Sequence, residues 1–315
     1  MKFNKFLILS FFLSLLVSSC NKDDGPAPVD PPEIRDEAEV MAEDNIEIME
    51  FLETHFYEMI PNPANPNYEI IKFDTIAGSN SEKEPIMESE FLETKTVTQN
   101  DLEYTLYYLK IREGAEMEPK PTFADLAVAT YRGQTMDLTI FDESVTPYKF
   151  DLPGQYGIGG IVKGLLEAFV EFRGASDYTE NPDNTIDFTD DFGIGAVFIP
   201  SGLAYFSQSP STQIPQYSPL IFTFQLYETI QGDPDDDGIP SLYEDLNEDK
   251  YLTEDSDSDG VPNFLDMDDD GDGTPTSEEI VVNDLNEDGY ITEDELTLTD
   301  TDADGTPDYL DPEVN

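Results

Sequence analysis

The sequence predicts an α+β fold: an antiparallel half-barrel sheet wrapped on one short helix, with a helical extension before it and an acidic repeat tail after it. The sheet is predicted by segments rich in β-branched and aromatic residues, which favour strands, at residues 104–114, 123–133, 148–152, 196–201 and 219–229. The short helix is predicted at residues 160–172, because apolar residues share one helical face there at Val162, Leu165, Leu166 and Phe169.

A second helix is predicted in the extension, over residues 44–60. Apolar residues recur at helical spacing, and Asp44 is placed to cap the first turn; the apolar positions are Ile46, Met49, Leu52 and Phe56. The proline-rich segment at residues 61–67 ends this helix, since proline cannot continue it. The only histidine, His55, is expected to be a packing or surface residue.

The chain is strongly acidic. Its 315 residues include 70 Asp or Glu and 15 Lys or Arg, which gives a formal net charge of −55 at pH 7. The sequence has no basic patch, and this excludes nucleic acid as a partner, because phosphate contacts need clustered Lys and Arg. An acidic surface favours cations as partners, or serves solubility.

The N-terminus reads as a targeting segment, at residues 1–20. Lys2 and Lys5 precede the apolar run FLILSFFLSLLV, which is typical of a secretory signal. The run ends at LVSSC, which resembles the lipobox of bacterial lipoproteins and implies that Cys20 carries the lipid. Cys20 is the only cysteine, so the exported protein can form no internal disulfide.

Residues 21–43 follow as a proline-rich, flexible linker. The resemblance to lipoproteins implies an outer-membrane lipoprotein, on the periplasmic face or the cell surface, held to the membrane through its lipid. The triplet from Lys22 to Asp24 resembles a short signal that sends some Gram-negative lipoproteins to the surface, and ordinary linker charge is the alternative.

The tail, residues 231–315, contains 31 acidic residues and one basic residue, Lys250. Five twelve-residue repeats run over residues 233–244, 255–266, 268–279, 284–295 and 300–311. Their oxygen-bearing residues at positions one, three, five and twelve, with Gly at six, have the spacing that a calcium ion needs. The predicted ligands are Asp233, Asp235, Asp237, Glu244, Asp255, Asp257, Asp259, Asp266, Asp268, Asp270, Asp272, Glu279, Asp284, Asn286, Asp288, Glu295, Asp300, Asp302, Asp304 and Asp311. A sixth repeat, from Asp245, lacks both the Gly and the final carboxylate.

Proline at position eight distinguishes four of the repeats, at Pro240, Pro262, Pro275 and Pro307. In a paired EF-hand this position donates a backbone N–H to the partner loop, and proline has none. These loops therefore resemble the aspartate-rich repeats of thrombospondin type 3, while the repeat with Ile291 at position eight keeps an EF-hand pattern. We expect calcium to have a structural role here; the alternative is a disordered acidic tail.

The middle of the chain carries a series of short motifs in a fixed order. ATYRG, FDES, YKFDL, GIVKGLLEAF, IPSGLAYF, IP and PLIFTFQL follow one another within residues 104–228. This order is similar to that of FKBP-type peptidyl-prolyl isomerases, including lipid-anchored forms. The resemblance implies a domain at residues 118–230 with an apolar cup, and residues 44–117 then form an N-terminal extension leading into the first strand.

The resemblance also implies the residues of the cup: Tyr131, Phe141, Asp142, Tyr148, Ile161, Val162, Leu165, Tyr205, Ile214 and Phe222. Tyr205 is expected to offer a hydroxyl donor, and Asp142 to accept hydrogen bonds inside the cup. Two positions depart from the family: Leu165 stands where Trp is usual in the floor, and Phe206 stands where Gly follows the flap tyrosine.

Three hypotheses follow. The first is a lipid-anchored prolyl isomerase that acts on proline-containing exported polypeptides and needs no cofactor for catalysis. The second is a non-catalytic FKBP-like subunit of an outer-membrane secretion or uptake complex. The third is a purely structural calcium-dependent surface protein. Leu165 and Phe206 favour the second hypothesis, and the other cup residues favour the first.

Overall fold

The computed structural model describes residues 33–63, 65–66, 68–157, 160–183 and 185–314. The predicted signal, the predicted lipid site at Cys20 and most of the predicted linker lie outside these residues. Within the described part of the chain, no helix has the length and apolar character needed to cross a membrane.

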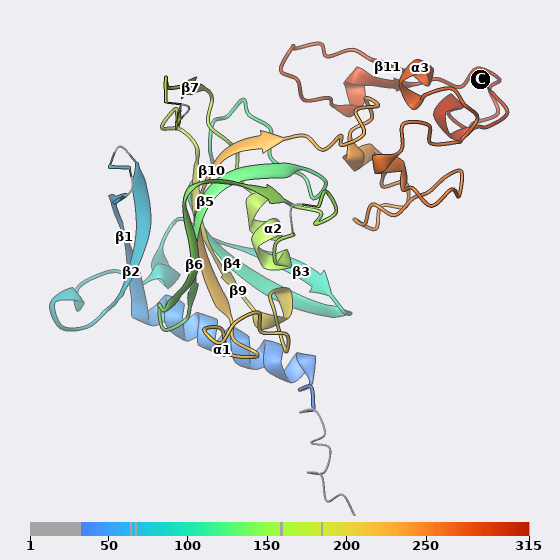
Figure 1. The fold of residues 1–315 in the computed structure, drawn as a ribbon. Helices are drawn as coiled ribbons and strands as arrows, with labels where there is room; N and C mark the ends of the chain where they lie inside the picture. The colour runs from blue at the N-terminus through green and yellow to red at the C-terminus, as the bar shows by residue number, and fades with distance from the viewer. Residues whose placement is uncertain (1–32, 64, 67, 158–159, 184, 315) are drawn as a thin grey trace, which may run out of the picture. The chain divides into compact units, whose positions relative to one another are not determined.

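A six-stranded antiparallel sheet forms the centre of the fold, in the order β3-β4-β9-β10-β5-β6 (Figure 1). The strands are β3 (Leu92–Gln99), β4 (Leu102–Arg112), β5 (Leu126–Thr135), β6 (Ile140–Asp151), β9 (Gly193–Ile199) and β10 (Leu220–Ile230). The predicted α+β class and antiparallel sheet are confirmed. Strands β3 and β4 join this sheet although they precede residue 118.

One face of the sheet is covered by the short helix α2 (Lys163–Phe169), as the sequence predicts. Phe169 packs edge-on against Phe224 of β10, with 4.9 Å between the ring centroids. Gly164 allows the helix to approach β9, because a Cβ at this position would overlap the side chain of Ile199. The apolar core on this side contains the floor of the predicted cup.

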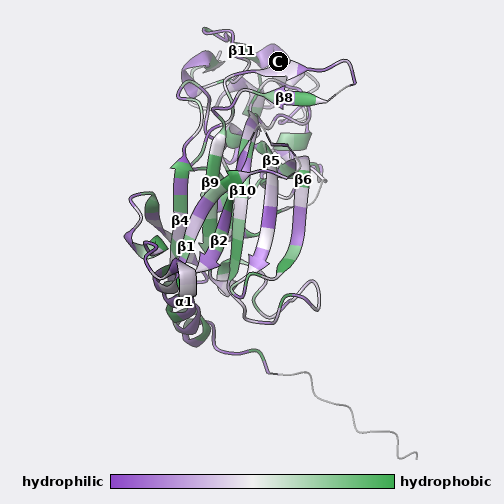
Figure 2. Ribbon diagram, turned by 90° about the vertical axis from the view of Figure 1, so that its left-hand side faces the viewer, coloured by the Kyte–Doolittle hydropathy of each residue, from purple (hydrophilic) through white to green (hydrophobic). Residues whose placement is uncertain are grey.

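The opposite face is covered by α1 (Glu37–Thr54) and the hairpin of β1 (His55–Pro61) and β2 (Glu69–Thr75). Ile48, Phe51 and Leu52 of α1 are buried in a second apolar cluster. Phe51 packs against Phe198 of β9 at 5.7 Å between ring centroids. Figure 2 shows hydrophobic residues interspersed along the mostly hydrophilic ribbon of α1, which suits a helix with one buried face.

The boundaries predicted for this helix are wrong. It begins after Asp36, whose side chain accepts a hydrogen bond from the backbone N–H of Glu39, so Asp36 and not Asp44 is the N-cap. Residues 55–60 belong to β1, because His55 already has extended backbone. Ile46 is 67% exposed, and the buried face runs instead through Val40, Asp44, Ile48, Phe51 and Leu52.

His55 is a packing residue, as expected. Its ring stacks on Phe51 with 3.9 Å between the centroids and an interplanar angle of 7°. Burial lowers the pKa of the imidazole, partly offset by the backbone of Phe51 and by Asp74.

The remaining elements are short. The acidic segment after α2 forms a hairpin of β7 (Tyr178–Glu180) and β8 (Ile186–Phe188). The tail contains α3 (Thr276–Glu279) and a pair of strands, β11 (Ile280–Val282) and β12 (Leu296–Leu298). Single 3-10 turns lie at Gly78–Asn80, Ile86–Glu88, Ser201–Leu203, Ser241–Glu244, Asn263–Leu265, Glu293–Glu295 and Asp308–Leu310.

Candidate functional site

An open cleft of about 510 Å³ lies where the sequence predicts the cup. It is bounded by β5, β6 and β10, by the segment leading into α2, and by the loop after β9. Its lining residues are Tyr131, Asp142, Tyr148, Phe150, Gly160, Ile161, Val162, Lys163, Leu165, Ala204, Tyr205 and Phe222. Eight of the ten predicted cup residues are therefore brought together around one cleft.

The other two predicted residues, Phe141 and Ile214, do not line the cleft. Phe141 stands behind it, edge-on to Phe222 at 5.6 Å between ring centroids. Ile214 is buried at 4% exposure in the same apolar core. Both support the cleft wall from outside and do not form its surface.

Aromatic rings form one wall of the cleft. The ring of Phe150 meets Tyr131 at 5.3 Å and Tyr148 at 5.1 Å, both edge-on, and offset or edge-on pairs are the favoured arrangements of aromatic rings. Phe150 was missed in the list of predicted lining residues. Its signal is the alternation in YKFDL, where residues 148 and 150 face the same side of a strand.

The polar groups of the cleft are few. The Tyr131 hydroxyl donates a hydrogen bond of 2.7 Å to Asp142, so Asp142 accepts inside the cleft, as expected. Burial, and then the bond to Asp142, raise the pKa of Tyr131. Burial and the charge of Asp142 also raise the pKa of Tyr205. Among the described residues no group hydrogen-bonds the Tyr205 hydroxyl, so this donor is free to bind a carbonyl.

Leu165 and Phe206, the two residues that depart from the motifs the sequence resembles, have different positions. Leu165 lies in the floor of the cleft with 2% of its surface exposed, so the floor is aliphatic. Phe206 does not line the cleft; its ring packs edge-on against Tyr217 at 4.9 Å. Its φ of 48° lies in the left-handed region that favours glycine.

The five complete tail repeats share one backbone conformation. The glycine at position six has positive φ in every repeat, at Gly238, Gly260, Gly273, Gly289 and Gly305. The residue at position four is also left-handed in each repeat, with φ from 59° to 70°. In four repeats the N–H of this glycine donates to the carboxylate at position one. The repeats are therefore tight turns that direct their carboxylates inward.

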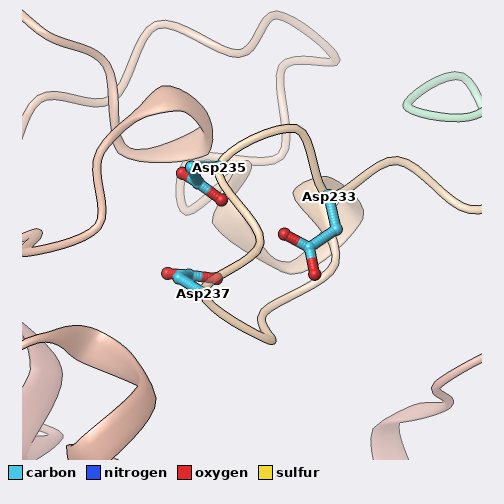
Figure 3. A group of neighbouring side chains, drawn as sticks. All are labelled: Asp233, Asp235 and Asp237. Carbon is cyan, nitrogen blue, oxygen red and sulfur yellow. The ribbon is translucent and has the colours of Figure 1, made fainter.

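Carboxylates converge in four of the five repeats. Oxygens from positions one, three and five lie within 4.8 Å of one another at residues 233, 235 and 237, at 255, 257 and 259, at 268, 270 and 272, and at 300, 302 and 304. Figure 3 shows the first group, in which the three side chains face a common space inside the turn. Such like-charged oxygens repel each other unless a cation or protons neutralise them.

Several of these oxygens are buried without any hydrogen-bond partner. They include both oxygens of Asp235, Glu244 and Glu279. Burial, followed by the neighbouring acidic groups, raises the pKa of Asp235 to about 8 and that of Glu279 to about 7. Buried polar groups are normally paired, so orphaned, convergent oxygens fit a hard cation such as calcium.

The repeat at residues 284–295 differs from the others. Among the described residues it forms no group of three converging carboxylates, because position three is Asn286, whose amide donates to Asp288 at 2.9 Å. Glu295, predicted as its final ligand, accepts from the N–H and hydroxyl of Thr292 and from the N–H of Leu285. The predicted Glu295 ligand is thus engaged as a capping residue here.

The position-twelve carboxylates also differ in placement. Of the five position-twelve carboxylates, all within the described chain, only that of Glu244 lies in a converging group, together with those of Asp237 and Asp269. Asp266 and Asp311 instead accept hydrogen bonds from the backbone N–H groups of Asp268 and Glu313. Asp269 was not predicted as a ligand, because it occupies position two of its repeat.

The tail contacts the sheet domain through defined groups. The Asp125 carboxylate accepts from the Gly232 N–H and from the Tyr290 hydroxyl, both at 3.1 Å. Phe264 of the tail lies against the ring of Tyr156 at 5.9 Å between centroids. Burial raises the pKa of Tyr290, followed by its interaction with Asp125.

Comparisons with known proteins give one family match, in the tail, and several structural matches. The family described as BamM C-terminal matches residues 234–283. No curated protein matches the chain.

Three solved structures are similar over less than half of the chain. One is a peptidyl-prolyl cis-trans isomerase from Pseudomonas syringae pv. tomato, with 18% identity over 46% of this chain and 84% of that chain, and a TM-score of 0.33. FkpA from Escherichia coli has 20% identity over 45% and 53%, with a TM-score of 0.32. The three FKBP domains of wheat FKBP73 have 16% identity over 44% and 51%, also with a TM-score of 0.32. This chain thus spans about half the length of the second and third proteins.

Proposed function

We propose that this chain is a lipid-anchored peptidyl-prolyl cis-trans isomerase that assists the folding of exported proteins, with a tail that binds structural calcium. The proposal is carried by one observation: the cleft joins an apolar, aromatic wall to a free hydroxyl donor at Tyr205. The ordered sequence motifs support the same reading. The lipid anchor at Cys20 and the outer-membrane location rest on the N-terminal sequence.

The chemistry of such a cleft needs no nucleophile. Rotation about a peptide bond costs about 18–20 kcal/mol because resonance is lost, and uncatalysed X-Pro exchange takes on the order of tens to hundreds of seconds. The twisted amide has less charge separation than the planar one, so an apolar wall stabilises it relative to water. A donor that meets the carbonyl in the twisted state, here the Tyr205 hydroxyl, would lower the barrier further.

Asp142 would contribute by holding the wall. Its carboxylate fixes the Tyr131 hydroxyl and so the ring that meets Phe150. Burial first, and then the negative charge of Asp142, raise the pKa of Tyr205 above its ordinary value. Asp142 is therefore a positioning residue in this proposal.

Calcium would be held by the acidic side chains that converge in the tail repeats. When bound, the ion supplies positive charge that cancels the repulsion among these carboxylates. Its preference for six to eight oxygen ligands in flexible geometry suits several carboxylates and backbone carbonyls in one turn.

The second candidate is a non-catalytic binding subunit of an outer-membrane complex. The aliphatic floor at Leu165 favours it, because this floor lacks the usual aromatic surface. The match of residues 234–283 to the BamM C-terminal family is consistent with association with such a complex. In this case the cleft would hold a partner segment without accelerating its isomerisation.

An isomerisation assay on X-Pro peptides, with the chain lacking residues 1–20, tests the leading proposal. The unaltered chain should accelerate exchange, and Asp142→Val should reduce kcat/KM without changing the unfolding temperature. Absence of acceleration on several X-Pro peptides, together with measurable peptide binding, would support the second candidate instead.

A further inference from the structure

Three buried carboxylates from two different repeats meet outside the pattern that the sequence predicts. Asp237 and Glu244 belong to the repeat at 233–244, and Asp269 belongs to the repeat at 268–279. One oxygen from each lies within 4.8 Å of the others. The exposed fractions of the three residues are 2%, 1% and 2%.

These side chains have oxygens that nothing in the described chain satisfies. Both Glu244 oxygens, Oδ2 of Asp237 and Oδ1 of Asp269 lack a hydrogen-bond partner. None of the ten ion pairs of the described chain involves these three carboxylates. Burying three unpaired carboxyl groups together is costly, so a counter-charge is needed to hold them ionised.

The orientation of Asp269 is built by the fold. The Thr276 hydroxyl, itself 0% exposed, donates to Oδ2 of Asp269 at 3.2 Å and accepts from the Asp269 N–H at 3.2 Å. This arrangement occupies one carboxylate oxygen and leaves Oδ1 buried without a hydrogen-bond partner, in a side chain that converges with Asp237 and Glu244. Position two of a calcium repeat has no ligand role within its own loop, so the Asp269 carboxylate is available to the first repeat.

We infer that Asp237, Glu244 and Asp269 together bind one calcium ion, which links the first repeat to the repeat at 268–279. The donor set contains only oxygen and carries no His or Cys, which suits a hard divalent cation. The inference rests on the proposed calcium binding of the tail and adds a ligand and a link that the repeat pattern does not contain.

The link has a structural consequence. Asp237 also belongs to the group with Asp233 and Asp235, so the shared ion lies beside the intra-repeat group. An ion held from both sides closes the intervening segment, residues 245–268, into a loop. Such cross-links stabilise a fold by restricting the unfolded chain.

Calorimetric titration of calcium into the chain lacking residues 1–20 tests the shared site. Asp269→Asn should remove one bound ion or weaken one binding step by at least about 10- to 100-fold, the loss that removal of even an outer-shell partner of a metal site typically causes. The matched control is Asp236→Asn, which removes the same charge from an exposed position in the first repeat. It should leave the number of bound ions unchanged.

Hydrogen exchange distinguishes a shared ion from two separate ones. With calcium, Asp269→Asn should reduce amide protection in residues 233–244, and Glu244→Gln should reduce it in residues 268–279. Loss of protection confined to the substituted repeat, or equal calcium binding by Asp269→Asn and Asp236→Asn, would overturn the shared site while leaving calcium binding intact. No calcium binding by the unaltered chain would overturn the calcium proposal itself.

Discussion

At the scale of single residues, the cleft is lined by three tyrosines, and the hydroxyls of two of them, Tyr131 and Tyr205, differ in their hydrogen bonds. The Tyr131 hydroxyl is committed to Asp142, whereas the Tyr205 hydroxyl has no partner in the described chain. Both have a raised pKa, so both remain protonated at neutral pH. Of these two, only Tyr205 can therefore donate to a bound peptide without breaking an existing hydrogen bond.

Replacing this hydroxyl gives the sharpest test of its role. Tyr205→Phe should lower kcat/KM for X-Pro peptides about fivefold, because a neutral hydrogen bond contributes about 1 kcal/mol. The ring and its packing remain, so the unfolding temperature should stay within error of the unaltered chain. Tyr178→Phe, at an exposed position of the β7–β8 hairpin, is the control and should change neither quantity. Equal activity of both variants would remove Tyr205 from the mechanism.

A buried carboxyl on α1 gives a pH-dependent stability. Asp44 accepts hydrogen bonds from the N–H and hydroxyl of Ser201, and burial raises its pKa to about 6 despite these bonds. Because the folded pKa lies above the ordinary value, the contribution to stability is complete below about pH 4 and is lost as pH rises through about 6. The loss is at most about 3 kcal/mol for a shift of about two pKa units.

Urea unfolding at several pH values, with calcium present, checks this contribution. In the unaltered chain, the contribution of Asp44 should appear as a stepwise fall in the free energy of unfolding between about pH 4 and 7. Asp44→Asn should remove this step, so the stability difference between variant and unaltered chain changes over that range. Glu50→Gln, at an exposed position on the same helix, should retain the step. A step of the same size in Asp44→Asn would show that another group causes it.

The residues that form the cleft were easier to predict than the contacts that each residue makes. The cup residues followed from ordered motifs, and the structure places eight of ten around one cleft. The cap of α1 was misjudged because Asp36 and Asp44 are both plausible N-caps by residue type alone. Only the contact with Ser201, far away in the sequence, makes Asp44 a core residue. Asp269 was missed for the same reason, since its partners lie in another repeat.

At the scale of elements, the contact of α2 with β9 fixes the floor of the cleft. Leu165 and Phe169 project from this helix into the apolar core. The close approach depends on Gly164, which faces Ile199. Glycine at this position thus allows the helix to pack close to the sheet.

Gly164→Ala separates packing from helix propensity. Propensity alone would stabilise the helix by about 1 kcal/mol, but overpacking against Ile199 should cost about 1–3 kcal/mol and give net destabilisation in urea unfolding. Adding Ile199→Ala makes room for the new methyl group, so the double variant should lose less stability than the sum of the single variants. Stabilisation by Gly164→Ala alone would contradict this account of the contact.

Strands β4, β5, β9 and β10 were predictable because apolar and aromatic residues dominate their segments, whereas only the last part of β6 was predicted, since most of that strand is exposed. β3 was not predicted, because LETKTVTQ is polar and only Val97 is buried among its residues. β3 is a strand because its backbone pairs with that of β4. The end of α1 was also missed, because the apolar spacing of a helix continues by chance into β1.

At the scale of the whole molecule, an acidic tail is joined to a sheet domain with an ordinary apolar core. Asp125 of the sheet domain accepts from the tail at Gly232 and Tyr290. The repeats themselves are rich in unpaired buried carboxylate oxygens. The stability of the tail should therefore depend on cations, and that of the sheet domain should not.

Calcium at millimolar concentration should make the tail compact and resistant to proteases, because it cancels the repulsion among the carboxylates. Magnesium should protect poorly, since it demands tighter octahedral geometry. Limited proteolysis and X-ray scattering of the chain lacking residues 1–20, in calcium, magnesium or chelator, measure this. The sheet domain should remain uncut in chelator. An unchanged radius and cleavage pattern in calcium would leave only a solvated acidic tail.

The central claim, that the cleft catalyses X-Pro isomerisation, is tested most directly by NMR exchange spectroscopy on one X-Pro peptide titrated with the chain. The measurement reports binding and the rate of cis-trans exchange in the same sample. The account predicts an exchange rate that rises in proportion to the concentration of the chain and falls about fivefold with Tyr205→Phe. Binding of the peptide in the cleft with exchange still on the order of tens to hundreds of seconds would contradict it.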